Sequence, residues 1–158
     1  GGLHGVGISV VNALSQKLTV RVKKNGALHE MTFSGGDVIS PLTEIDTVGK
    51  RNTGTSVTFL PDPKYFDNPK FSAKQLKHTL RAKAVLCPGL HVNFIDENTD
   101  EACEWCFEDG LKDYLVESLK GYDALPEQPL VGNFKANDEE VEWALQWLPE
   151  NSGVINES

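Results

Sequence analysis

The stretch GGLHGVGISVVNALS, residues 1–15, runs from closely spaced glycines directly into an apolar segment. Val6, Val10 and Leu14 recur at helical spacing, so we expect a helix to begin within it. A glycine-rich turn before a helix N-terminus points backbone N–H groups outward, and the helix dipole adds partial positive charge. Because glycine has no Cβ, phosphate oxygens can approach closely. The stretch therefore predicts an anion site, with a purely structural turn as the alternative.

The order of the glycines separates this stretch from two common phosphate loops. A Walker A loop ends in Gly-Lys-Ser/Thr, whereas the first lysine here is Lys17. The dinucleotide fingerprint is G-x-G-x-x-G, whereas Gly2, Gly5 and Gly7 follow the order G-x-x-G-x-G. The complete string resembles the ATP-lid glycine motif of the GHKL ATPase superfamily, which includes gyrase, histidine kinases and MutL. Within that superfamily it resembles the B subunits of bacterial type IIA topoisomerases.

Composition limits the partners and the compartment of the protein. The chain has 158 residues and a net charge of −8, so this part offers no basic surface for nucleic acid. It lacks an apolar run long enough to span a bilayer and a signal peptide. Three cysteines, an odd number, favour a reducing cytoplasm over a disulfide framework. Because the sequence opens inside a motif, we expect an internal segment of a longer protein.

Alternating apolar residues predict a hairpin after the first helix. Residues 17–24 and 27–33 read as two strands, and Asn25-Gly26 between them is a type I′ turn signal. Residues 37–52 are polar and contain a proline, so we expect irregular structure there, with a short strand near Val38-Ile39.

A second motif follows in the stretch NTGTSVTFL, residues 52–60, which predicts a turn and then an alternating strand. It resembles the later Gly-Thr motif of the family, whose threonine lies beside the adenine through an ordered water. On that resemblance, Thr55 is the candidate adenine contact and Gly54 its close-approach partner.

The remaining sequence predicts two helices and several short strands. Ser72 is a good N-cap for a helix that ends near Pro88-Gly89. Residues 125–129 contain two prolines and predict a linker. The stretches 81–89 and 50–55 resemble the topoisomerase IV branch of the family more than the gyrase branch. Further elements are expected as strands at 90–95, 130–134 and 140–148 and as a helix at 109–119.

The pair Cys103 and Cys106 raises the question of a zinc site completed by Cys87 and His91. Residues 103–107 alternate like a strand, which would direct the two thiols to opposite faces. No glycine or proline supplies a tight metal-binding turn there. We therefore predict structural thiols and no metal site.

The resemblance implies an α+β fold in two parts. Residues 1–124 would form the C-terminal part of a Bergerat-type (GHKL) ATPase α/β sandwich, from the ATP lid onward. Residues 125–158 would begin a transducer domain like ribosomal protein S5.

The resemblance also implies an ATP-operated clamp, with ATP and Mg²⁺ as cofactors. Two B subunits would dimerise on binding ATP and trap a DNA segment for passage through a break held by the A subunit. The complex, a heterotetramer of topoisomerase IV A and B subunits in the bacterial cytoplasm, would contact DNA through its other parts. The expected ATP-binding residues are Gly2, Leu3, His4, Gly5, Val6, Gly7, Ile8, Gly54 and Thr55.

The family's general base, its Mg²⁺-binding Asn and its adenine-reading Asp precede the lid, and its γ-phosphate lysine follows beyond Ser158. We therefore assign no catalytic residue and expect no ATP hydrolysis by this chain alone. The B subunit of gyrase is the near alternative. A mismatch-repair ATPase or a non-enzymatic interaction module with a structural glycine turn are the others.

Overall fold

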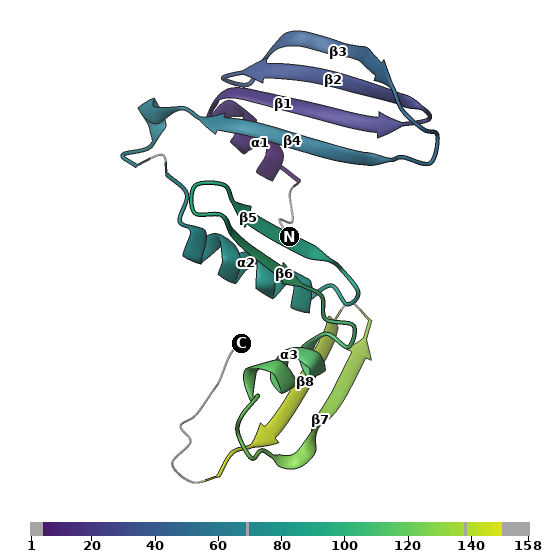
Figure 1. The fold of residues 1–158 in the computed structure, drawn as a ribbon, viewed down its shortest axis with the longest axis vertical. Coiled ribbons are helices and arrows are strands. Elements are labelled where there is room, and N and C mark those ends of the chain that lie inside the picture. The colour runs from purple at the N-terminus through teal and green to yellow at the C-terminus, as the bar shows by residue number, and fades with distance from the viewer. Residues whose placement is uncertain (1–4, 69, 138, 150–158) are drawn as a thin grey trace. The chain divides into compact units, whose positions relative to one another are not determined.

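The computed structural model describes residues 5–68, 70–137 and 139–149, and the chain divides into two compact units. The first unit is Gly1–Lys70 and the second is Phe71–Ser158 (Figure 1). Both contain helices and antiparallel strands, so the predicted α+β class is confirmed. The domain boundary expected after residue 124 falls within the second unit and stays a prediction.

In its described residues, the first unit has one short α-helix and a 3-10 helix beside a four-stranded antiparallel sheet of order β3-β2-β1-β4. The predicted helix is α1, Gly7–Ala13, and it packs against β1 and β2. Its C-terminal end lies close to the β2–β3 turn, where a Cβ at Gly36 would be 3.6 Å from Ala13 Cα. The other elements are β1 (Ser15–Lys24), β2 (Ala27–Ser34), β3 (Asp37–Thr47), β4 (Gly54–Pro61) and the 3-10 helix η1 (Pro63–Tyr65).

The predicted hairpin turn between β1 and β2 is confirmed. Asn25 has a φ of 55° and Gly26 a φ of 88°, and a type I′ turn needs both central residues in this left-handed region. The turn fixes a continuous register in which Val22 pairs with His29 and Leu18 with Phe33.

The short strand expected near Val38-Ile39 is confirmed as part of the edge strand β3, whereas the irregular structure expected in the rest of residues 37–47 is wrong. All of its residues are exposed, so the sequence carries no buried alternation that would indicate a strand. Pro41 lies where the β2–β3 register is irregular, between the pairs Glu30–Thr43 and Thr32–Ser40. A proline is tolerated at such a bulge on an edge strand because no ladder hydrogen bond is lost.

The second unit contains two helices, each packed against a hairpin. The helix α2 (Ala73–Val85) begins as predicted, because Ser72 Oγ accepts a hydrogen bond from the backbone N–H of Gln75 at 3.3 Å. Ala84 and Val85, at the C-terminal end of this helix, pack with Phe107 in a small core. The hairpin strands are β5 (Val92–Asp96) with β6 (Glu101–Trp105) and β7 (Leu125–Ala136) with β8 (Glu139–Trp147), and α3 (Leu111–Ser118) packs against β7 and β8.

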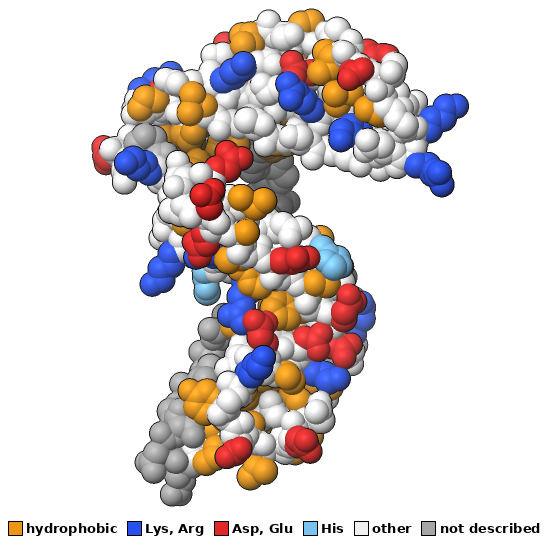
Figure 2. All heavy atoms as spheres, viewed as in Figure 1, with side chains coloured by type: hydrophobic (Ala, Val, Ile, Leu, Met, Phe, Trp, Pro, Cys, Tyr) orange, Lys and Arg blue, Asp and Glu red, His pale blue; other side chains and the backbone are white. Residues whose placement is uncertain are grey.

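Two expectations for the second unit are corrected. Residues 125–129, predicted as a linker, belong to β7, where a register irregularity between Leu125 and Leu130 accommodates the prolines. The helix expected to end near Pro88-Gly89 ends at Val85, and Leu86 just after it is 66% exposed. Hydrophobic side chains are visible at the surface of both units (Figure 2).

Candidate nucleotide-binding site

The N-terminus of α1 follows the glycine-rich stretch, of which Gly2, Leu3 and His4 lie outside the described residues. Gly5 has a φ of 64°, a conformation that a residue with a Cβ adopts only with strain. Among the residues that the structure describes, no atom lies within 4 Å of a Cβ built at Gly5 or Gly7. The glycine preference at Gly5 therefore comes from backbone conformation.

The first turn of α1 leaves its backbone donors available. Val6 occupies the N-cap position, and among the described residues no side chain caps the helix or places a carboxylate in its first turn. The first N–H groups of a helix have no intrahelical partner and need an acceptor. Val6 and Ile8 are 56% and 55% exposed, so this turn lies at the surface of the first unit.

The second predicted contact, at Gly54 and Thr55, lies at the start of β4. Thr55 pairs with Val22 and Gly54 with Lys23, near the end of β1. Both residues are exposed, and a Cβ at Gly54 would meet no atom within 4 Å. The backbone here can therefore be approached closely by a flat ligand.

Strand register places Thr55 on the apolar face of the sheet. Cross-strand partners share a face and alternate residues point the same way, so the pairs Val22–Thr55, Val20–Val57 and Leu18–Phe59 lie together. Val57 is 43% exposed and Phe59 40% exposed. Leu18 on this face is buried, whereas the part next to Thr55 is partly exposed. A partly exposed apolar surface next to a hydroxyl suits a purine, which needs a nonpolar platform and a few polar contacts.

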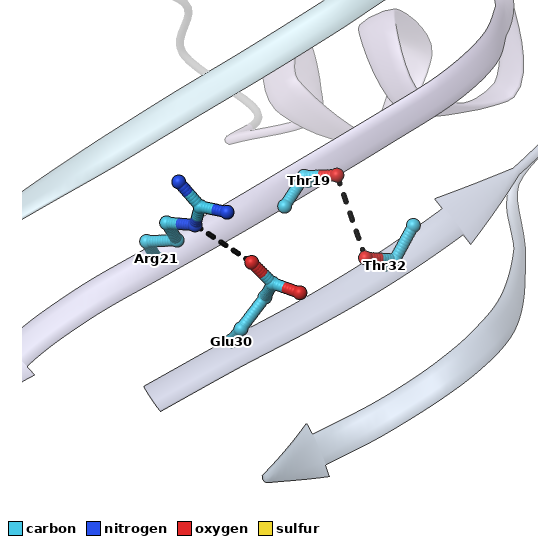
Figure 3. A network of polar contacts seen from close by, with 4 residues as sticks. All are labelled: Thr19, Arg21, Glu30 and Thr32. Carbon is cyan, nitrogen blue, oxygen red and sulfur yellow. Dashed lines mark hydrogen bonds and ion pairs between the residues drawn. The ribbon is translucent and has the colours of Figure 1, made fainter. Parts of the chain in front are cut away.

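The opposite face of the same strands is polar. Arg21 Nε donates to Glu30 Oε2 at 2.6 Å, and the hydroxyls of Thr19 and Thr32 lie 3.4 Å apart (Figure 3). A cavity of about 340 Å³ at the end of these strands is lined by Arg21, Lys23, Leu28, Thr53, Gly54, Thr55 and Ser56. Arg21 and Ser56 are a cross-strand pair on this face. The cavity therefore opens mainly on the polar face. Thr55 is among its lining residues, but the register directs the Thr55 side chain to the apolar face, and we do not assign the cavity to adenine.

A cluster that the sequence analysis did not assemble lies in the second unit. Among the side chains that the structure describes, His91, Cys106 and Glu108 bring ligand atoms within 4.8 Å of one another. His91 and Cys106 were considered as zinc ligands from the sequence, together with Cys87 and Cys103, whereas Glu108 was missed. The signal was the hairpin register, because pairing of Val92 with Trp105 places residues 91 and 106 opposite each other.

The thiol in this cluster is held in its neutral form. Cys106 Sγ donates to Glu108 Oε1 at 3.5 Å. Burial, and then this hydrogen bond, raise the pKa of the Cys106 thiol. All three cysteines are free. Along the described ranges, no helix combines the length and apolar character needed to cross a bilayer.

Comparison with known proteins identifies the fold and the family. No family model matches the chain. It is 58% identical over its whole length to the topoisomerase IV B subunit of Pseudomonas aeruginosa, of which it spans 25%. It is 36% identical over 99% of its length to the gyrase B subunit of Haloferax volcanii, again spanning 25% of that protein.

Two solved structures agree with this assignment. The topoisomerase IV ATP-binding domain of Francisella tularensis, in complex with a small-molecule inhibitor, matches 91% of the chain at a TM-score of 0.73 and 40% identity. The 43K ATPase domain of Thermus thermophilus gyrase B, in complex with an aminocoumarin, matches 88% of the chain at a TM-score of 0.80 and 35% identity. The chain covers 39% and 38% of these structures.

The fold is therefore that of the GHKL ATPase domains of type II topoisomerases. The chain belongs to the family of topoisomerase IV and gyrase B subunits, and it matches the topoisomerase IV members more strongly. It spans about a quarter of the length of these curated relatives.

Proposed function

We propose that this chain supplies the lid and the adenine-side strand of the ATP site in a topoisomerase IV B subunit. The observation that carries the proposal is the match of 91% of the chain to a topoisomerase IV ATP-binding domain. The uncapped first turn of α1 behind Gly5 supports the phosphate side, because its N–H groups can donate to anionic oxygens.

The residue types indicate which part of the nucleotide each segment contacts. In the lid, Gly2, Leu3, His4, Gly5, Val6, Gly7 and Ile8 bind the triphosphate mainly through backbone N–H groups. On β4, the Thr55 hydroxyl hydrogen-bonds the adenine side, and Gly54 leaves room for the ring beside the backbone. The apolar face formed by Val20 and Val57 supports this part of the proposal, since Thr55 shares that face.

The cofactors and partners follow from the proposed family role. The complete protein binds ATP with Mg²⁺, dimerises on doing so and works with two topoisomerase IV A subunits in the bacterial cytoplasm, on the chromosome. DNA contacts lie in other parts of the complex, in keeping with the charge of −8 on this chain. ATP turnover drives unlinking and relaxation of DNA. Hydrolysis needs a metal ion and a positioned water, and the family's residues for both precede the lid. We therefore assign no catalytic residue to the chain.

The test uses the complete subunit that carries this chain, paired with its A subunit and supplied with ATP and DNA circles. We expect interlinked circles to be separated and relaxed circles to gain no negative supercoils. Negative supercoiling would assign the subunit to gyrase. A folded complex with neither activity would contradict the proposal and favour an interaction module.

A further inference from the structure

The hairpin of β5 and β6 brings three different metal-ligating side chains together at its open end. The last cross-strand pair is Val92 with Trp105, so His91 and Cys106 are the next two residues on opposite strands. The backbone N–H of Gly89 donates to Phe107 O at 3.1 Å, which holds the two chain segments together beyond the sheet. Glu108 then lies beside Cys106, just before α3.

The geometry points to a divalent metal site, and we propose that His91, Cys106 and Glu108 bind Zn²⁺ with a fourth position open to water. Their ligand atoms lie within 4.8 Å of one another. In a tetrahedral zinc site, metal–ligand distances of about 2.0–2.3 Å place ligand atoms roughly 3.3–3.7 Å apart. His91 and Glu108 are exposed, so rotamer changes alone can close that gap.

The chemistry of the three ligands favours zinc over a harder ion. A thiolate, an imidazole and one carboxylate suit Zn²⁺, whereas Mg²⁺ and Ca²⁺ require oxygen ligands. Glu104 adds an outer partner, since its Oε1 lies 3.6 Å from His91 Nδ1. Coordination through Nε2 leaves Nδ1–H to donate to Glu104, an arrangement common around zinc-bound histidines. Cys87 and Cys103 are not needed as ligands of the proposed ion.

Metal at this position would join the open end of the hairpin to the segment before α3. That segment approaches α2, because Phe107 packs on Ala84 and Val85. An ion that binds only the folded arrangement raises its stability by mass action. The proposed ion would therefore have a structural role, linking these two segments of the second unit, whereas the proposed nucleotide contacts belong to the first unit.

The test is titration of the complete chain with Co²⁺ after treatment with a chelator. We expect one equivalent to give the intense absorption of a cobalt–thiolate bond, to be displaced by Zn²⁺ and to raise the melting temperature. Cys106→Ala should abolish the absorption, and His91→Ala and Glu108→Ala should each weaken binding about tenfold or more. Cys87→Ala and Cys103→Ala are the matched controls and should bind normally.

Two results would overturn the site. One is a wild-type chain without the cobalt–thiolate absorption, and the other is absorption that survives Cys106→Ala or disappears in either cysteine control. If Cys106→Ala fails to fold by circular dichroism, the exposed His91→Ala variant decides the question. Unchanged Co²⁺ affinity in folded His91→Ala would exclude the proposed ligand set.

Discussion

A Cβ placed on Gly132 of β7 would lie 2.3 Å from Cζ2 of Trp143, its cross-strand partner on β8. The indole covers the backbone where any side chain would have to stand. Gly132→Ala therefore forces the ring from its position, and we expect the free energy of unfolding to fall by about 1–3 kcal/mol. Urea unfolding followed by tryptophan fluorescence measures it.

Gly49→Ala is the matched control for this prediction. A Cβ there would meet no atom within 4 Å, and its φ lies outside the left-handed region. We expect its stability to stay within about 0.5 kcal/mol of the wild type. Equal stability of Gly132→Ala and Gly49→Ala would contradict the close packing of the indole on β7.

The two faces of β4 give a paired prediction for nucleotide affinity. Thr55 lies on the apolar face with Val57, whereas Ser56 pairs with Arg21 on the polar face. If Thr55 contacts the adenine side, Thr55→Ala in the complete subunit should weaken ATP binding by roughly 1 kcal/mol, about fivefold. Ser56→Ala should leave the affinity within about twofold. Calorimetry would contradict the assignment if Ser56→Ala had the larger effect.

The turn of the β5–β6 hairpin predicts an acid-sensitive contribution to stability. Asp96 Oδ1 accepts hydrogen bonds from the backbone N–H of Asn98 at 2.9 Å and from Asn98 Nδ2 at 3.0 Å. The backbone hydrogen bond is the main cause that lowers the pKa of the Asp96 carboxyl. The stabilisation is therefore complete above the unfolded pKa of about 3.9 and is lost as pH falls through the lower folded value.

Carbon-13 NMR of the side-chain carboxyl checks this prediction directly. The Asp96 resonance should titrate below about pH 3.9 in the folded chain. Asp96→Asn should remove the corresponding part of the pH dependence of the urea midpoint. A folded pKa at or above the unfolded value would show that the turn does not favour the carboxylate.

Local signals in the sequence predicted much of the fold. The Asn25-Gly26 turn, the Ser72 cap and the strand expected at 140–148 each depend on neighbouring residues, and each is confirmed. Only the start of the edge strand β3, near Val38-Ile39, was predicted, because its pairing with β2 is a nonlocal interaction and its residues are all exposed.

The candidate sites differ in how far the sequence reveals them. Gly5 and Thr55 were found through motif resemblance, and the register adds that Thr55 faces the apolar side of the sheet. The group of His91, Cys106 and Glu108 was missed because cysteines were paired by spacing rather than by hairpin register. Which side chains meet depends on register, and a one-residue shift reverses every face.

The most direct test of the central claim is protection of the lid by nucleotide in the complete subunit. With ATP and Mg²⁺, residues 1–8 should become resistant to proteolysis. Gly5→Ala should abolish that protection, because a side chain at φ 64° strains the lid, while Gly49→Ala should retain it. Cleavage at the same rate with and without nucleotide in a folded wild-type subunit would contradict an ATP lid in this stretch.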